Sequence, residues 1–281
     1  MTSAALDVGL CLLLISAAAV TVTSAPGAEG RLDRDRSGAV AETLTATTAD
    51  VPYRLDPVPG SDADGNPEYD RVAHGTVASL LADVAVRTVH VDREALTGTN
   101  DGFATAVRET VAERLPDRTR VVVRWAPVSN SHVSREFAVG PTPPPDADVH
   151  AETVRAPSGV DAPTNASAVA SAEGYDGLGR LVADAVVDGL LPPEKGRLAL
   201  GGDAPIDDLV RHRYRRVSDR YGVDTVGSIE RGDTHTANRR IAAAMGDRFA
   251  ADLRRNSERP RDAAASLELD TVEISVRTWS P

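Results

Sequence analysis

The residues of this chain that could do chemistry are its histidines and carboxylates. The histidines are His74, His90, His132, His150, His212 and His235. None has the His-x-His or His-Glu-x-x-His spacing that holds zinc. His132 and His150 could meet across paired strands, but two imidazoles are too few for a zinc site. Glu109 and Glu113 share one face of a predicted helix, where we interpret them as exposed to solvent.

One acidic segment resembles a calcium-binding loop. In "SDADGNPEYD", Asp62, Asp64 and Asn66 occupy the first, third and fifth positions of an EF-hand-like loop. The match ends there, because Pro67 stands where a glycine is needed and Ala73 where a bidentate glutamate is needed. We interpret the segment as a solvated acidic linker and expect no metal.

Two further patterns are typical of anion sites. Gly174, Gly177 and Gly179 precede a predicted helix, but no strand comes before them and their order is not GxGxxG. A basic run follows later and contains Arg211, His212, Arg213, Arg215, Arg216 and Arg220. Asp207, Asp208 and Asp219 lie four residues from Arg211, His212 and Arg215, which favours a salt-bridged helix face over an anion site.

No motif identifies a reaction. The chain has no GxSxG turn, no Ser-x-x-Lys before Lys195 and no Walker loop. We therefore predict a non-enzymatic protein with no catalytic residue and no cofactor. The alternative within the enzymes is a hydrolase whose site is assembled from scattered His, Asp and Glu side chains.

Hydrophobic spacing predicts the elements that would position these residues. Helices are expected from the N-cap Ser37 to about Ala49, and over residues 68–92, 103–115, 178–190, 206–217 and 241–253. Alternating patterns predict a hairpin over 119–139 and strands over 148–155 and 272–278, with the last strand pairing with the hairpin. The expected fold class is α+β, with a three- to five-stranded antiparallel sheet packed with about five helices.

We interpret the acidic charge balance as an adaptation to a salty solvent and not as a sign of a ligand. The chain has 42 Asp and Glu against 31 Lys and Arg, for a net charge of −11, and Lys195 is its only lysine. Such a surface repels nucleic acid, so no nucleic-acid partner is expected. An Asp-rich composition nearly free of lysine is typical of proteins of extreme halophiles, where acidity is an adaptation to salt.

The N-terminus carries an uncharged apolar stretch from Val8 to Ala28, which is long enough to span a bilayer as a helix. A cleaved signal peptide is disfavoured because "MTSAALD" has no basic residue and Pro26 follows the candidate cleavage site at Ala25. A soluble core helix is disfavoured because the stretch has no regularly spaced polar face. Cys11, the only cysteine, excludes disulfides within the chain.

We therefore predict a transmembrane anchor over residues 1–28, a stalk and linker over 29–67, and an extracytoplasmic α+β domain over 68–281. Two features conflict on orientation. Arg31, Arg34 and Arg36 follow the span, and the positive-inside rule would keep the C-terminal bulk in the cytoplasm. Asn165, in the triplet Asn-Ala-Ser, is the chain's glycosylation acceptor and favours an extracellular domain.

The chain resembles an uncharacterised haloarchaeal family. The resemblance rests on the short N-terminal span together with "DVPYRL", "RWAP", "FAVGPTPPPDADVHAETVRAPSG" and the terminal "VRTW". Members of that family are encoded among pilin-like proteins and the assembly machinery of type IV pilus-like or Tad-like secretion systems. Archaeal prepilins carry a basic residue before the apolar stretch, whereas this chain has only Asp7 there, so prepilin processing is not implied.

The resemblance implies a membrane-anchored accessory or minor structural subunit, pilin-like or TadE-like, facing outward from a single-pass anchor in the cell membrane. Its partners would be membrane lipid and other subunits of the apparatus. The alternative is a surface-anchored domain that binds a ligand or glycan, and a concave pocket with converging polar side chains would favour it.

Overall fold

The computed structural model describes residues 28–58, 69–96 and 102–280, and the structural statements below concern these residues. The helices are α2 (Ala28–Ala46), α3 (Val77–Arg87), α4 (Phe103–Ala112), α5 (Ala166–Leu190), α6 (Pro193–Leu200), α7 (Ile206–Tyr221), α8 (Val226–Glu230), α9 (Thr234–Asn256) and α10 (Pro260–Ala265). The strands are β1 (Thr48–Arg54), β2 (Asp70–Thr76), β3 (His90–Val91), β4 (Glu94–Ala95), β5 (Thr119–Trp125), β6 (Val133–Val139), β7 (Val149–Pro157) and β8 (Thr271–Trp279).

The predicted α+β class is confirmed, with a six-stranded antiparallel sheet in the order β4-β3-β6-β5-β8-β7 and a two-stranded one of β1 and β2. The predicted hairpin forms as β5 and β6, and the final strand β8 pairs with β5 as expected. Six strands exceed the three to five expected, because β3 and β4 have only two residues each and leave no alternating pattern to detect.

The sheet has one apolar face and one charged face. Val123 lies between Phe137 and Ile274 across three strands, and all three side chains are buried. One residue further along, Glu136, Arg124, Glu273 and Arg155 lie side by side across β6, β5, β8 and β7, with alternating charge and exposed to solvent. This period of two is what the sequence encodes, because successive side chains point to opposite faces of a sheet.

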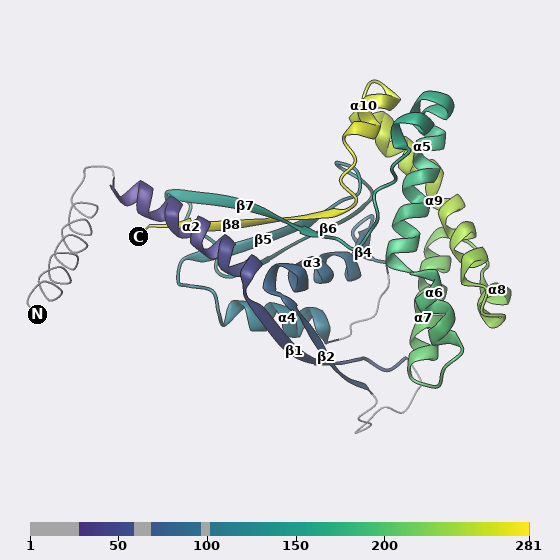
Figure 1. Ribbon diagram of the computed structural model, residues 1–281, viewed down its shortest axis with the longest axis horizontal. Helices are drawn as coiled ribbons and strands as arrows, with labels where there is room; N and C mark the ends of the chain where they lie inside the picture. Colours follow the sequence, from purple (N-terminus) through teal and green to yellow (C-terminus); the bar gives the residue numbers. More distant parts are fainter. Residues whose placement is uncertain (1–27, 59–68, 97–101, 281) are drawn as a thin grey trace, which may run out of the picture.

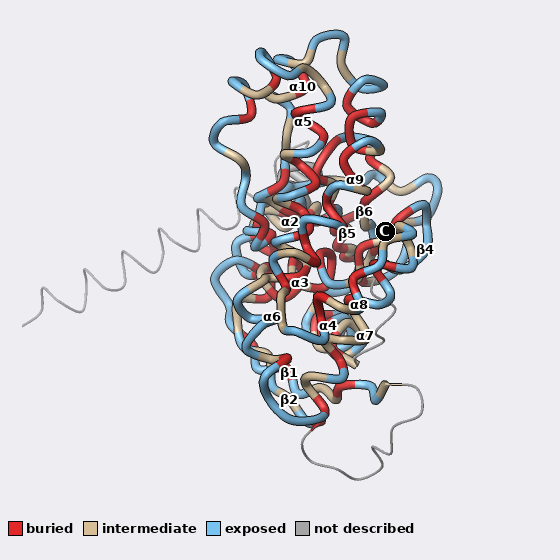
Figure 2. Tube along the Cα trace, turned by 90° about the vertical axis from the view of Figure 1, so that its right-hand side faces the viewer, coloured by how far each residue is buried: buried red, intermediate tan, exposed pale blue. Residues whose placement is uncertain are grey.

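Helices α2, α3 and α4 lie along the sheet, and α5 to α10 stand together at its far end (Figure 1). Figure 2 shows the buried residues gathered in the middle of the molecule and along α5 and α9. The described residues contain nine helices, against about five expected for the domain and one for the stalk. The extra ones include α6, α8 and α10, which are eight residues long or shorter and so span too few turns for a clear apolar period.

The expected stalk over residues 29–67 differs from the structure in its described part. Helix α2 begins at Ala28 rather than at Ser37, and Ser37 is fully buried in its middle. Val40, Ala41 and Leu44 join the main core, where α2 contacts β7 and β8. Charged residues flank these three apolar positions, so the sequence does not show a clear apolar face. The three buried side chains nevertheless attach the helix to the sheet.

The helix predicted over residues 68–92 is wrong at both ends, because α3 covers only Val77–Arg87 and residues 90–91 form strand β3. Asp70–Thr76 is strand β2, which pairs with β1 in a two-stranded sheet that also falls on the expected stalk and linker. Val72, counted in the helical spacing, is 66% exposed on the outer face of this sheet opposite Pro52. The helix starts at Val77, because Thr76 caps it by accepting a hydrogen bond from the backbone N–H of Ser79 at 3.1 Å.

Among the described residues, no helix has the length and apolarity needed to cross a membrane. The predicted anchor, apart from its last residue, and the calcium-like segment Asp62–Pro67 lie outside the described residues.

Helices α5 and α9 approach closely at a glycine contact. A Cβ atom on Gly179 would lie 2.5 Å from the carbonyl oxygen of Gly246 and 2.6 Å from the backbone nitrogen of Ala250. Both are backbone atoms, so α9 would have to move. The two helices can therefore pack at this distance only because residue 179 has no side chain.

We expect Gly179→Ala to lower the free energy of unfolding by about 2 to 3 kcal/mol through this overpacking. The matched control is Gly38→Ala in α2, where a Cβ would meet no atom within 4 Å. There the better helix propensity of alanine should be neutral or stabilising by up to about 1 kcal/mol. Chemical denaturation followed by circular dichroism measures both, and equal effects of the two substitutions would contradict the close contact.

Candidate functional site

A cavity of about 500 Å³ lies between two parts of the fold. One side is formed by β1, β2 and α3, and the other by the end of α5 together with α6 and α7. Ser158 and Gly159, directly after β7, complete the lining. Segments that are far apart in the sequence therefore meet here, and this volume falls in the range of small-molecule pockets, about 300 to 1,000 Å³.

The walls of the cavity are largely apolar. They include Leu55, Leu190, Leu191, Ile206, Leu209 and Val210. Leu55, Tyr69 and Leu209 form a small core of their own, which joins the β1–β2 sheet to α7. This second core holds the two sides of the cavity at a fixed separation.

Cations from four different elements line the same cavity: Arg71 of β2, Arg87 of α3, Lys195 of α6 and Arg213 of α7. The carboxylate of Asp83 faces them, with its oxygen 3.8 Å from the Arg87 guanidinium. Burial raises the pKa of Asp83, and the charges of Arg87 and Lys195 oppose this rise. Among the described residues that line the cavity, four side chains are thus cationic and one is a carboxylate.

The inner wall is held by a buried hydrogen-bond chain. The Tyr214 hydroxyl donates to Oδ1 of Asn238 at 2.9 Å, and Nδ2 of Asn238 donates to Asp188 and to the carbonyl of Leu191, each at 2.8 Å. Tyr214 is 1% exposed, and burial raises its pKa far above neutrality, so the hydroxyl stays protonated. The wall is therefore fixed at this point by hydrogen bonds.

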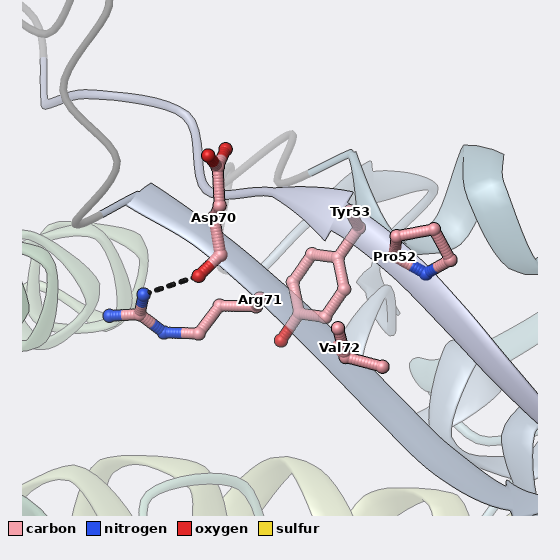
Figure 3. Close-up of a pocket in the computed structure, with 5 residues that line it drawn as sticks. All are labelled: Pro52, Tyr53, Asp70, Arg71 and Val72. Atoms are coloured by element: carbon pink, nitrogen blue, oxygen red, sulfur yellow. Dashed lines mark hydrogen bonds between the residues drawn. The ribbon is translucent and has the colours of Figure 1, made fainter.

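A shallower hollow lies on the neighbouring surface of the β1–β2 sheet, lined by Pro52, Tyr53, Asp70, Arg71 and Val72. Figure 3 shows the Arg71 side chain directed away from Pro52 and Val72, with a hydrogen bond from its guanidinium to the carbonyl of Asp70 at 2.7 Å. Tyr53 and Arg71 line both this hollow and the cavity, so the two lie next to each other.

A second cluster of chemically capable residues is buried between α9 and the start of β6. Oδ2 of Asp252 lies 2.5 Å from Nδ1 of His132 and 2.9 Å from its backbone nitrogen, and it accepts a hydrogen bond from Ser131 at 3.2 Å. Arg255 bonds to the other oxygen. The Tyr221 hydroxyl lies 3.4 Å from Nε2 of His132.

The arrangement of Tyr221, His132 and Asp252 resembles a base-activated nucleophile, but its environment favours a structural role. Burial raises the pKa of Tyr221, which opposes formation of a phenolate. The His132 and Asp252 side chains are only 6% and 3% exposed, and neither residue lines the cavity. The cluster instead links α7 and α9 to the sheet through hydrogen bonds between polar side chains. Each of these side chains would destabilise the fold if it were buried without its partners.

The other histidines are dispersed. His74 pairs with Asp50 at 2.6 Å on the exposed face of the β1–β2 sheet, and His235 lies 3.0 Å from Glu194. The expectation that His132 and His150 could meet across paired strands is wrong, because β5 and β8 separate β6 from β7. No three His, Cys, Asp or Glu side chains form a metal-binding group in the described part of the chain.

The sequence patterns typical of anion sites have different outcomes. Gly174 breaks α5 at a φ of 66°, and Gly177 and Gly179 are buried in the helical segment that follows, so these two glycines belong to a helix and not to a loop. In the basic run, Arg211 pairs with Asp207 at 3.7 Å as a helix-surface pair. Arg220 reaches Glu94 at 2.6 Å, and Arg213 lines the cavity. Glu109 and Glu113 are exposed, as expected.

Sequence reasoning missed Asp252 and most of the cavity. Asp252 follows Phe249 by three residues and so falls on the apolar face marked by Ile241, Met245 and Phe249, which is a readable signal for a buried carboxylate. Arg71, Arg87 and Lys195 share no spacing, because each comes from a different element. Nothing in the sequence brings these three together.

Asp252 gives a pH-dependent test of the buried cluster. Burial raises the pKa of this carboxyl, but the hydrogen bonds from His132 and Ser131 outweigh it, and the net shift is downward. A carboxyl whose pKa is lower in the folded chain adds stability above its unfolded pKa and loses it as the pH falls through its folded value.

We therefore expect Asp252→Asn to lower the free energy of unfolding by about 2 to 4 kcal/mol near pH 7. Near pH 3 the effect should be smaller, because this pH lies below the ordinary pKa of an aspartate and part of the stability gained from ionisation is already lost. Denaturation at both pH values measures this. Asp247→Asn on the exposed side of the same helix is the control and should change stability by less than about 0.5 kcal/mol. An equal loss for Asp252→Asn at both pH values would refute an ionic role for Asp252.

Comparison with known proteins gave one result. The model of a family of unknown function, DUF7284, matches residues 6–279, which covers nearly the whole chain. Neither the search of curated proteins nor that of solved structures returned a match. The match spans the helices, the sheet and every residue that lines the cavity. The chain belongs to the family of unknown function DUF7284.

Proposed function

We propose that this protein is a membrane-anchored, non-enzymatic accessory or minor structural subunit of an archaeal pilus-like or secretion apparatus. Residues 8–28 act as its anchor, and its α+β domain lies outside the cell. The partners would be membrane lipid and pilin-like or secretion-apparatus subunits in a haloarchaeon, consistent with the acidic composition nearly free of lysine.

The observation that carries this proposal is how α2 joins the domain. The uncharged stretch ends at Ala28, where α2 begins. Ser37, Val40 and Leu44 of this helix are buried against the sheet region. Arg36 donates to the carbonyl of Asp117 at 2.8 Å, across 81 positions of the sequence. An anchor in this place would hold the domain close to the bilayer, as a subunit packed among neighbours requires.

The same contact bears on orientation. Arg36 is one of the three arginines whose positive charge favours a cytoplasmic domain. Its guanidinium donates a hydrogen bond to the backbone carbonyl of Asp117, so Arg36 has a structural role in the domain. Asn165 is exposed just before α5, where a glycan could be attached without disturbing the core. Both points support an extracellular domain.

A second candidate function is a surface-anchored ligand-binding domain. The cavity lined by α3, α6 and α7 is the observation that favours it, because polar side chains from several elements converge there on apolar walls. The two functions are compatible, since an apparatus subunit can also bind a ligand.

The anchor is tested by removing it. We expect the full chain to sediment with membranes and to need detergent for release, whereas a variant lacking residues 1–27 should appear in the soluble fraction. The truncation leaves α2 complete, so its far-UV circular dichroism should remain that of a folded α+β protein. A soluble full-length chain, or a truncated one still bound to membranes, would count against the proposal.

Orientation is tested by labelling intact cells with a membrane-impermeant thiol reagent. With Cys11→Ser removing the native thiol, Glu152→Cys on the exposed surface of β7 should be labelled without lysis. Asn165→Gln provides a second readout, because it should increase electrophoretic mobility if the acceptor carries a glycan. Labelling that requires lysis would place the domain inside the cell.

A further inference from the structure

We propose that the charged face of the six-stranded sheet docks against the same face of a second copy of this chain. The two copies stack face to face about a twofold axis that runs parallel to the strands. The direction of this axis rests on the proposed membrane anchor, whereas the match of charges does not.

The fold leaves this face of the sheet uncovered. Helices α3 and α4 lie together on the other side, where the apolar residues of the strands are buried (Figure 1). On the charged face, Glu136, Arg124, Glu273 and Arg155 are all exposed. A surface that spans four strands is therefore available for a neighbour.

The charges on this face are self-complementary. Glu136, Arg124, Glu273 and Arg155 lie side by side on β6, β5, β8 and β7, so their signs alternate across the sheet. Turning a second copy over, about an axis along the strands between β5 and β8, reverses the order of the strands. Arg124 then faces Glu273 of the second copy, and Glu136 faces Arg155 of the second copy. Each charge meets an opposite one.

These side chains are little used within the chain itself. In the part of the chain that the structure describes, Glu136, Arg124 and Glu273 form no ion pair or side-chain hydrogen bond. Arg155 lies 3.9 Å from Glu268, and the two side chains are 67% and 61% exposed, so this pair is weak. Pairs buried between two copies are screened much less by salt than exposed pairs. The contact is therefore suited to a salty solvent.

The adjacent row of residues lets two sheets approach each other. Ala138, Val122, Ser275 and Thr153 lie side by side on the same face, next to the row of charges. All four are small and uncharged. Two sheets pack about 10 Å apart when the side chains between them interdigitate. This row provides the close contact, and the charged row sets which strands face each other.

The direction of the axis follows from the anchor. Arg36 of α2 donates to the carbonyl of Asp117, and the next residue bonds to Trp279 at the end of β8. From there α2 runs along the sheet (Figure 1). An axis parallel to the strands keeps the direction of α2 in the second copy, so both anchors enter one membrane. An axis in the sheet plane but perpendicular to the strands would point the two anchors in opposite directions.

The contact is small and has a repulsive end. Four strands and two rows of residues cover roughly 300 Å² on each copy, against about 800 Å² per partner in a standard complex. In the next row, Arg120 on β5 and Arg277 on β8 lie opposite each other, and the same axis brings Arg120 against Arg277 of the second copy. We therefore expect pairing where a membrane confines both copies and raises their effective concentration.

The experiment is cross-linking of the full chain in phosphatidylcholine liposomes, at a KCl concentration that preserves its circular dichroism. With Cys11→Ser removing the native thiol, Ser275→Cys lies next to the axis, and a short bismaleimide should join two copies. Glu152→Cys is the matched control. It is exposed on β7 but belongs to the opposite face, so it should not cross-link. Dilution into detergent should abolish the dimer band on a denaturing gel.

Charge reversal tests which residues face each other. In the Ser275→Cys background, Arg124→Glu and Glu273→Arg should each lower the cross-linked fraction by at least about fivefold, because each brings like charges together. The two substitutions combined should restore it. Arg277→Glu should raise it, since the repulsion with Arg120 becomes an attraction. Arg259→Glu, next to α10 and exposed, should leave it unchanged. Thermal unfolding shows that each variant is folded.

The outcomes distinguish this inference from the proposed function. Equal cross-linking through Ser275→Cys and Glu152→Cys, or no cross-linking through Ser275→Cys in a membrane-bound chain, would overturn the pairing and leave the anchor intact. A folded double variant that fails to recover would overturn the match of charges. A full chain that does not enter liposomes would instead refute the proposed anchor, and with it the direction of the axis.

Discussion

The position of the helical layer relative to the sheet depends on one buried carboxylate, that of Asp252. It accepts hydrogen bonds from Ser131 and from the backbone and ring of His132, two residues just before β6, while it is itself part of α9. A buried charge is tolerated only when its hydrogen bonds replace the lost water, so the two layers must meet in one register to satisfy it. Because α6 and α7 pack on α9, the same bond also positions two walls of the cavity.

Charge is distributed unevenly over this fold, and the unevenness is informative. On the open face of the sheet, Glu136, Arg124, Glu273 and Arg155 alternate across four strands, so the charges are locally balanced. At the β3–β4 turn, Asp92 lies between Arg220 and Arg248. At the cavity, positive side chains from four elements meet at one place together with Asp83: Arg71, Arg87, Lys195 and Arg213.

The sequence predicts the elements with a long, regular period and fails where the period is short or hidden. Helices α4, α7 and α9 and strands β5, β6 and β8 follow from apolar spacing, because each has several buried residues in register. Strand β2 is not predicted, because Val72 was counted as a core position of a helix although its side chain is exposed to solvent. At the candidate site, Arg213 belongs to the basic run that the sequence shows. Its place in the cavity lining depends on how α7 packs, which no local sequence pattern encodes.

The attachment of α2 to the sheet has an entropic consequence. A domain on a loose tether samples many orientations and must give them up when it joins a neighbour, which weakens association. Here the first described helix is part of the core through Val40 and Leu44, so an anchored domain would have little orientational freedom left to lose. Copies diffusing in one membrane would then meet with the same face presented, and even a modest contact area could sustain an ordered array.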